Sequence, residues 1–185
     1  MNRRTVFVVV GLVALAGVFI FGLSKQGQVA RNDTAHVTVP PAGFQAFAAA
    51  PIAGTALDGT GFSLAALRGK PAFINFWAPT CIPCRKEAPQ LRSFASGLDG
   101  RASFVGVALD SRASDVRSFA TGAGWRYPIL SERCCGLVDS YGVVGLPTTI
   151  VVDAQGQVVD RLIGAQTRAR LQAELRALGA PGSSG

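Results

Sequence analysis

The architecture of this chain follows from the segment Phe76-Trp77-Ala78-Pro79-Thr80-Cys81-Ile82-Pro83-Cys84-Arg85-Lys86-Glu87-Ala88-Pro89. An apolar, strand-like run over residues 72–77 enters it, and a helix-like pattern leaves it. Cys81 and Cys84 stand at that junction. The unpaired N–H groups and the positive dipole end of a helix N-terminus stabilise a thiolate there, so its pKa falls from ~8.5 toward neutrality. The spacing therefore predicts a redox-active pair, with Cys84 one helical turn after Cys81.

The same Cys-x-x-Cys spacing also occurs as half of a structural zinc site. Such a site needs a second Cys or His pair, for which the chain offers only the adjacent Cys134 and Cys135 and the distant His36. The strand-then-helix context favours redox chemistry over zinc. We therefore expect neither a metal nor another cofactor at this junction.

The N-terminus predicts attachment to a membrane. Arg3 and Arg4 precede an uncharged apolar run from Val6 to Leu23. As a helix this run spans ~27 Å at ~1.5 Å per residue, close to the ~30 Å of a bilayer's hydrocarbon core. It is longer than the core of a cleavable signal peptide, and no Ala-x-Ala-like site follows it. Residues 1–23 therefore indicate a single-pass anchor in preference to a cleaved signal, with the rest of the chain outside the cytoplasm.

The charge pattern argues against nucleic-acid binding. The chain of 185 residues carries a net charge of +7, but its arginines are scattered. No dense Lys/Arg run with interleaved aromatic residues occurs, so the positive charge is typical of a solvated surface.

Composition divides the rest of the chain into three parts. Residues 24–50 are rich in Gly, Pro and Ala without sustained periodicity, which indicates a flexible tether. Residues 51–180 are long enough for one compact core. Residues 181–185, Pro-Gly-Ser-Ser-Gly, predict a disordered tail.

Within 51–180 the patterns predict an α/β fold with a mixed central sheet and helices on both faces. An Asp58-Gly59 turn between apolar-alternating arms predicts an N-terminal β-hairpin. The strand at 72–77, the helix after Cys81 and an apolar strand at 102–109 follow. Two strands at 148–152 and 157–163 and a last helix, capped by Thr167, complete the domain.

Four motifs together resemble those of thioredoxin-fold proteins of the TlpA/ResA/CcmG (DsbE-like) type. They cover residues 51–178 in the expected order and are Gly69-Lys70-Pro71, Asn75-Phe76-Trp77, the segment from Cys81 to Pro89, and the segment from Tyr141 to Thr149. The resemblance implies a thioredoxin fold preceded by a single transmembrane helix, and a thiol–disulfide oxidoreductase on the periplasmic side of the cytoplasmic membrane.

The resemblance also assigns roles to individual residues. It implies that Cys81 attacks, that Cys84 resolves and forms a disulfide with Cys81, that Pro147 has a cis peptide bond, and that Glu87 is an acidic group beside the cysteines. The substrate-binding residues that it implies are Trp77, Pro79, Ile82, Pro83 and Leu146.

Two features depart from the thioredoxin pattern. Asn75 stands where cytoplasmic thioredoxins have a buried aspartate, so a proton relay must use Glu87 or water. Cys134 and Cys135 stand where a plain polar turn is expected, and they are either structural or a second redox-responsive pair. Sequence alone does not choose among the three pairings of four cysteines.

The expected activity is exchange of a dithiol for a disulfide with protein partners. A ResA-like role implies reduction of the haem-binding Cys pair of apocytochrome c, with electrons from a membrane carrier of the CcdA or DsbD type. The alternatives are a disulfide oxidase for protein folding, a thiol peroxidase and a Sco-like copper chaperone. The last two fit less well, because Cys84 is too near Cys81 for the peroxidase pattern and no histidine follows His36.

Overall fold

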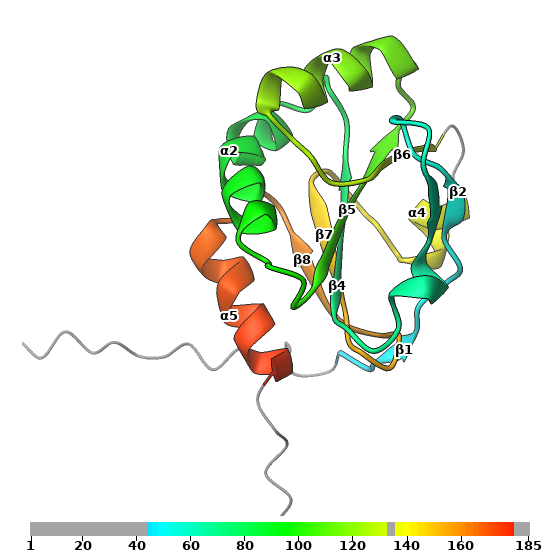
Figure 1. Cartoon of the computed structure of the whole chain (residues 1–185), viewed down its shortest axis with the longest axis vertical. Helices are drawn as coiled ribbons and strands as arrows, with labels where there is room; N and C mark the ends of the chain where they lie inside the picture. Colours follow the sequence, from blue (N-terminus) through cyan, green and yellow to red (C-terminus); the bar gives the residue numbers. More distant parts are fainter. Residues whose placement is uncertain (1–43, 133–135, 180–185) are drawn as a thin grey trace, which may run out of the picture. The chain divides into compact units, whose positions relative to one another are not determined.

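The predicted strand at 72–77 forms β4, the central strand of a six-stranded mixed sheet in a computed structural model that describes residues 44–132 and 136–179 (Figure 1). The sheet order is β1-β8-β7-β4-β5-β6. β5 and β6 run parallel to β4, whereas β7 is antiparallel to it. The strands are β1 (Phe47–Ala48), β4 (Ala72–Trp77), β5 (Ser103–Leu109), β6 (Ile129–Glu132), β7 (Thr148–Val152) and β8 (Gln157–Ile163).

Helices cover the two faces of the sheet unequally (Figure 1). One face packs against α2 (Ile82–Ser96), α3 (Ala113–Ala123) and α5 (Arg168–Gly179). The other face packs against the hairpin of β2 (Ala53–Thr55) and β3 (Gly61–Ser63), the 3₁₀ turn η1 (Leu64–Leu67) and the short α4 (Gly136–Ser140). Helices were predicted on both faces. Among the described residues, the second face carries only the short helices η1 and α4 beside the hairpin.

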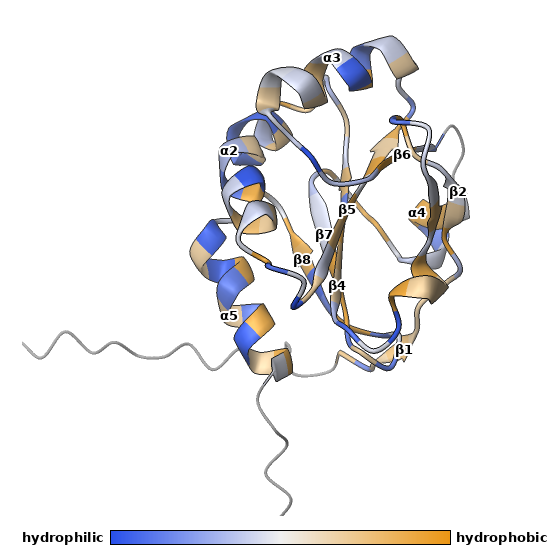
Figure 2. Ribbon diagram, viewed as in Figure 1, coloured by the Kyte–Doolittle hydropathy of each residue, from blue (hydrophilic) through white to orange (hydrophobic). Residues whose placement is uncertain are grey.

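Alternation along β4 sends its side chains to two separate cores. Phe73 and Trp77 enter the cluster under α2, α3 and α5, and Ile74 and Phe76 enter the cluster under the hairpin. Under α2, the ring of Phe73 lies 4.9 Å from that of Phe94. Figure 2 shows the hydrophobic strands inside and the hydrophilic stretches on the helices. The strand β4 and the helix α2, which meet at the junction, are thus packed against each other through buried aromatic side chains.

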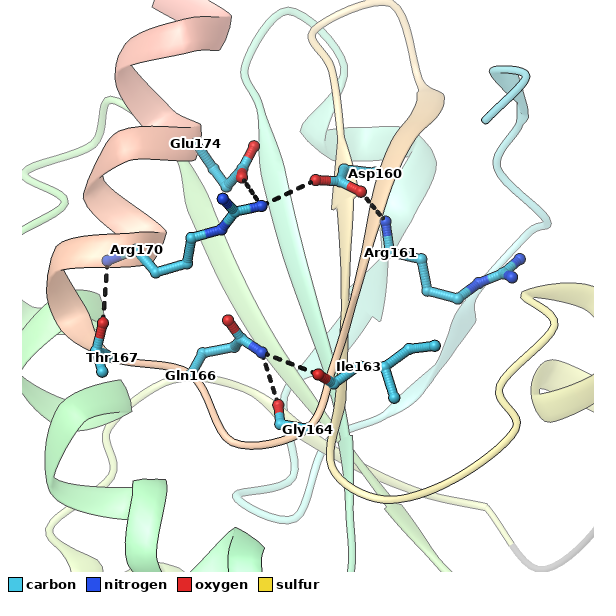
Figure 3. Close-up of polar contacts among 8 residues, drawn as sticks. All are labelled: Asp160, Arg161, Ile163, Gly164, Gln166, Thr167, Arg170 and Glu174. Carbon is cyan, nitrogen blue, oxygen red and sulfur yellow. Dashed lines mark hydrogen bonds and ion pairs between the residues drawn. The ribbon is translucent and has the colours of Figure 1, made fainter. Parts of the chain in front are cut away.

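Polar contacts fix the start of α5 against β8 (Figure 3). The guanidinium of Arg170 lies 3.5 Å from the carboxylate of Asp160 on β8 and 2.8 Å from that of Glu174 on its own helix. The predicted cap is present, since the Arg170 N–H donates to Thr167 Oγ1 over 3.2 Å. These contacts also position the loop between Ile163 and Thr167, which reaches the site described below.

The structure corrects the predicted extent of the tether. Phe47 and Ala48, assigned to residues 24–50, form β1 and pair with Val158 and Gln157 of β8. Two-residue edge strands have too little periodicity to be recognised, and pairing with a long-range partner creates this one. The hydroxyl of Tyr141 also donates to the carbonyl of Ala50.

Several predictions lie outside the described residues. They are the anchor at 1–23, residues 24–43 of the tether, Cys134 and Cys135, and the tail at 181–185. Among the helices of residues 44–132 and 136–179, none combines the length and apolar character needed to cross a bilayer.

Candidate functional site

Cys81 and Cys84 form a disulfide where β4 passes into α2. Cys81 is the residue that caps α2, and its sulfur accepts a hydrogen bond from the Cys84 N–H over 3.2 Å. Cys81 is half-buried, whereas Cys84 has no exposed surface. An incoming sulfur can therefore reach Cys81, and Cys84 is reached only through Cys81.

The residues between the cysteines favour this helix start. Pro83 lies in the first turn of α2, where its missing N–H would have had no helical partner. The Cys84 N–H of that turn donates to Cys81 Sγ, and this donor and the helix dipole stabilise a thiolate at Cys81 when the disulfide is reduced. Ile82 is exposed, with 67% of its surface accessible. The sequence thus forms a helix N-terminus that presents sulfur and apolar surface together.

The Leu146–Pro147 peptide bond is cis, as the resemblance implies. Pro147 directly precedes β7, and Thr148 of β7 pairs with Phe76 of β4. Because Cys81 follows β4, the disulfide and the cis-proline lie at the same end of neighbouring antiparallel strands. Pro147 is buried and Leu146 half-buried.

Glu87 is a buried carboxyl group on the face of α2 that carries Cys84, one turn further on. It accepts hydrogen bonds from the side-chain amide of Asn75 over 3.1 Å and from the backbone N–H of Gln166 over 2.9 Å. Burial nevertheless outweighs these donors and raises the pKa of Glu87 to about 7. A carboxyl group at this pKa can take up or release a proton at neutral pH.

Gln166 is a site residue that sequence reasoning missed. Its backbone N–H holds Glu87, and its side-chain amide donates to the carbonyl of Gly164 over 2.7 Å (Figure 3). The Gly164 N–H in turn donates to the carbonyl of Pro147 over 2.8 Å. One loop therefore holds both the acidic group and the cis-proline. No side-chain pattern signals this role, because backbone groups perform most of it.

The expectation that Trp77 contacts substrate does not agree with its position. Trp77 is fully buried, with its ring 4.7 Å from that of Trp125 and 5.0 Å from that of Phe119. As the last residue of β4 it points to the face covered by α2 and α3. It therefore packs inside the core next to the site and does not face the substrate. Pro79 is also buried, whereas Ile82 and Pro83 are exposed.

Three large apolar side chains are exposed at this end of the fold. They are Ile82, between the cysteines, Val144, at 78% exposure in the loop before Pro147, and Ile163, at 59% exposure at the end of β8. Thr148, next to Pro147, pairs with Ile163. The sequence placed Val144 in the family motif from Tyr141 to Thr149 and Ile163 at the end of a predicted strand, and assigned neither to the site. They are exposed apolar side chains in segments that carry or adjoin the disulfide and the cis-proline, and such side chains suit contact with an unfolded or extended polypeptide.

The described part of the chain contains no group of three His, Cys, Asp or Glu side chains that could hold a metal ion. Whether Cys134 and Cys135 contribute to such a site lies outside the described residues, so the prediction of no metal stays a prediction.

Comparison with protein families gives a match to the AhpC/TSA family over residues 45–161. A thiol-disulfide oxidoreductase ResA of Bacillus thuringiensis (strain Al Hakam) is 30% identical over 177 residues, which cover 95% of this chain and 96% of that protein. The thioredoxin-like protein YneN of Bacillus subtilis (strain 168) is 30% identical over 122 residues, covering 64% of this chain and 71% of YneN.

Two solved structures extend the comparison. A thioredoxin-family thiol:disulfide interchange protein of Chlorobium tepidum TLS superposes with a TM-score of 0.67 at 27% identity, covering 73% of this chain and 97% of that one. A secreted Mycobacterium tuberculosis disulfide oxidoreductase homologous to E. coli DsbE gives a TM-score of 0.61 at 29% identity. The match covers 69% of this chain and 96% of that one.

Proposed function

Because this chain belongs to the AhpC/TSA family of thioredoxin-fold proteins and is a thiol–disulfide oxidoreductase of the ResA/DsbE type, we propose that it reduces disulfides of polypeptides outside the cytoplasm. The observation that carries the proposal is an accessible Cys81 bonded to a buried Cys84 beside a carboxyl group with a pKa of about 7. This set of groups can complete both halves of a disulfide exchange.

In the first half, the Cys81 thiolate of the reduced protein attacks one sulfur of a substrate disulfide. A bond forms between Cys81 and that sulfur, the substrate S–S bond breaks, and the other substrate sulfur leaves as a thiolate. The N-terminus of α2 and the Cys84 N–H, which donates to Cys81 Sγ, favour the thiolate needed for the attack.

In the second half, Cys84 attacks Cys81 and releases the remaining substrate sulfur. Two electrons have then passed to the substrate, and the protein holds the Cys81–Cys84 disulfide. Cys84 must lose its proton inside the protein, because its side chain has no exposed surface. Ionised Glu87, on the same helix face, takes that proton directly or through water.

The proposed substrate is the haem-binding Cys pair of an apocytochrome c, in its disulfide form. The exposed side chains of Ile82, Val144 and Ile163 support an unfolded polypeptide as partner, and the backbone of the half-buried Leu146 would pair with an extended segment of it. A membrane dithiol carrier of the CcdA or DsbD type would return the electrons. The ResA name of the relatives supports this assignment.

The proposed location is the extracytoplasmic side of the cytoplasmic membrane, with residues 1–23 as the anchor. The apolar run from Val6 to Leu23 and the preceding Arg3 and Arg4 support it. In membrane fractions, the full chain should remain after a carbonate wash. In intact spheroplasts, added protease should digest the domain, and protection from the protease would contradict the proposed side.

Trapping identifies the substrate. A Cys84→Ala variant can attack but cannot resolve, so its substrates stay bonded to Cys81 and can be sequenced. A Cys81→Ala/Cys84→Ala variant is the control, since any adduct it forms comes from Cys134 or Cys135. The proposal is supported if Cys84→Ala traps a c-type apocytochrome and the doubly substituted control does not. Equal adducts from both variants would contradict it.

The direction of transfer separates a reductase from the alternative, a disulfide oxidase for protein folding, which would use the same residues. Equilibration of the Cys81–Cys84 pair with glutathione buffers gives its potential. A value below about −200 mV supports reduction, whereas a value near the roughly −120 mV of a strong oxidant would support the oxidase.

A further inference from the structure

A groove between α2 and α3 opens beside the disulfide. Its volume is about 820 Å³, which lies in the ~300–1,000 Å³ range of ligand-binding clefts and exceeds what a single ion needs. Pro79 and Thr80, which directly precede Cys81, line it, and so does Arg85, which directly follows Cys84. A polypeptide bonded to Cys81 therefore has this α2–α3 groove within reach of the residues next to its own cysteine.

The α2 wall of the groove is positively charged. Arg85 and Arg92 line it and are exposed, and Lys86 is exposed on the same helix. The acidic residue of α2, Glu87, is buried against the sheet and does not offset them. Within residues 44–132 and 136–179 both salt bridges belong to Arg170. Arg85 and Arg92 therefore present cationic groups that no carboxylate among these described residues neutralises by contact.

Arg85 is held in place at the groove. Its guanidinium donates to the carbonyl of Pro79 over 3.4 Å and lies 5.7 Å from the centre of the Phe119 ring. A guanidinium placed over an aromatic ring keeps N–H donors at its edge for a carboxylate. Because its position is already restricted, a carboxylate that binds it loses less side-chain entropy than at a mobile arginine.

The opposite wall carries one negative group. Asp115 of α3 lines the groove, is exposed, and accepts a hydrogen bond from the Ser114 hydroxyl over 3.3 Å. An anionic ligand is thus attracted by two lining arginines and repelled by one lining carboxylate. Removing a positive charge from the α2 wall should therefore weaken the binding of an anionic ligand. Removing the negative charge of Asp115 from the α3 wall should strengthen it.

We propose that the α2–α3 groove binds an acidic segment of the substrate polypeptide next to its reactive cysteine. The inference rests on the proposed function, because it needs a polypeptide bonded to Cys81, and it adds a preference for the charge of the flanking sequence. Electrostatic complementarity of this kind acts mainly on association, so its effect should fall as salt screens it.

The test uses three synthetic peptides that share one Cys-x-x-Cys disulfide. One has uncharged flanks, one has three glutamates on the N-terminal side, and one has three glutamates on the C-terminal side. We expect the reduced protein to reduce one acidic peptide with a kcat/KM about 3- to 10-fold above the uncharged one at low salt, the range expected for one or two exposed ion pairs. At about 0.5 M salt the preference should nearly vanish.

Matched variants assign the preference to the groove. Arg92→Glu should abolish it, and Asp115→Asn should increase it. Arg176→Glu makes the same change of net charge on an exposed position of α5 and should leave it intact. Each variant's rate with the uncharged peptide reports whether the redox site itself still works.

The outcomes separate the two proposals. If the wild-type protein reduces no peptide, the proposed function fails. If it reduces all three equally, or if Arg92→Glu and Arg176→Glu behave alike, only the groove inference fails. Binding to vesicles of anionic phospholipid that Arg92→Glu alone abolishes, without peptide discrimination, would overturn it in favour of a membrane surface.

Discussion

Glu87 is the residue whose chemistry and stability are most tightly linked. In an unfolded chain it ionises near its ordinary pKa of 4.5, whereas in the fold burial raises that pKa to about 7. Between these values the folded protein keeps a proton that the unfolded chain has lost, so stability falls as pH rises through this window. The shift corresponds to about 3 kcal/mol at ~1.4 kcal/mol per pKa unit.

Replacing Glu87 by Gln should remove this pH dependence. We expect the free energy of unfolding of the wild-type protein, relative to Glu87→Gln, to fall by about 3 kcal/mol between pH 4.5 and pH 7 and then to level off. Urea denaturation across that range measures it. Asp139→Asn, which removes an exposed carboxyl group, is the control. Parallel stability curves for the wild type and Glu87→Gln would contradict the buried ionisation.

The same substitution should slow the resolving step. A mixed disulfide between Cys81 and a chromophoric thiol reports the release of that thiol by Cys84. In the wild type the rate should rise with pH through a transition near 7. In Glu87→Gln it should be lower by about 100-fold at neutral pH, the lower end of what a positioned general base contributes. An unchanged rate would assign the proton transfer to water alone.

At the scale of elements, the loop from α4 to β7 depends on one glycine. Gly142 has a φ of 58°, and a Cβ there would lie 2.6 Å from the guanidinium of Arg161. Left-handed backbone costs about 1–2 kcal/mol for a residue with a side chain. Arg161 would also have to leave its position 5.9 Å from the Phe44 ring. The strand β8 and the loop before the cis-proline therefore meet at this point.

Gly142→Ala should destabilise the protein in urea denaturation by about 1–2 kcal/mol from the backbone conformation, with a further loss from the clash with Arg161. Adding Arg161→Ala should remove the clash but not the backbone cost, so the loss should be partly recovered. Gly145→Ala in the same loop is the matched control, because no atom lies within 4 Å of its added Cβ and its φ is not in the left-handed range. Equal losses in the two alanine variants would show that loop flexibility, not Gly142 itself, matters.

At the scale of the whole molecule, the segment before the hairpin belongs to the fold. β1 extends the sheet beyond β8, and the Tyr141 hydroxyl binds the Ala50 carbonyl from across the second core. A chain that starts at residue 51 would lose both contacts and expose the edge of β8.

A chain starting at residue 51 should be less stable than one starting at residue 44 by about 2–3 kcal/mol, the contribution of a few hydrogen bonds and partly buried side chains. Thermal and urea unfolding of the chain starting at residue 44 and of the chain starting at residue 51 measure the difference in stability. Removal of residues 180–185 is the control and should have no effect. If the two N-terminal truncations unfold alike, β1 contributes nothing to the domain.

Much of the site could be predicted from short segments. The strand run before Cys81, the helical spacing after it and Pro83 in the first turn indicate the junction, because each of these signals depends only on residues within a turn or two. The Asp58-Gly59 turn predicted the hairpin for the same reason. The motif around Pro147 identified the cis-proline through the family resemblance.

The remaining features depend on which surfaces pack together. The resemblance implied that Trp77 binds substrate, but Trp77 is buried because α3 and Trp125 pack over that end of β4. The Gln166 amide reaches Glu87 from a loop far along the chain, and β1 exists only because β8 offers an open edge. Sequence by itself determined where the sulfurs are and what backbone carries them, since backbone conformation is a local property. Only the tertiary structure decided which side chains surround them, because burial and hydrogen bonding join residues that no local pattern relates.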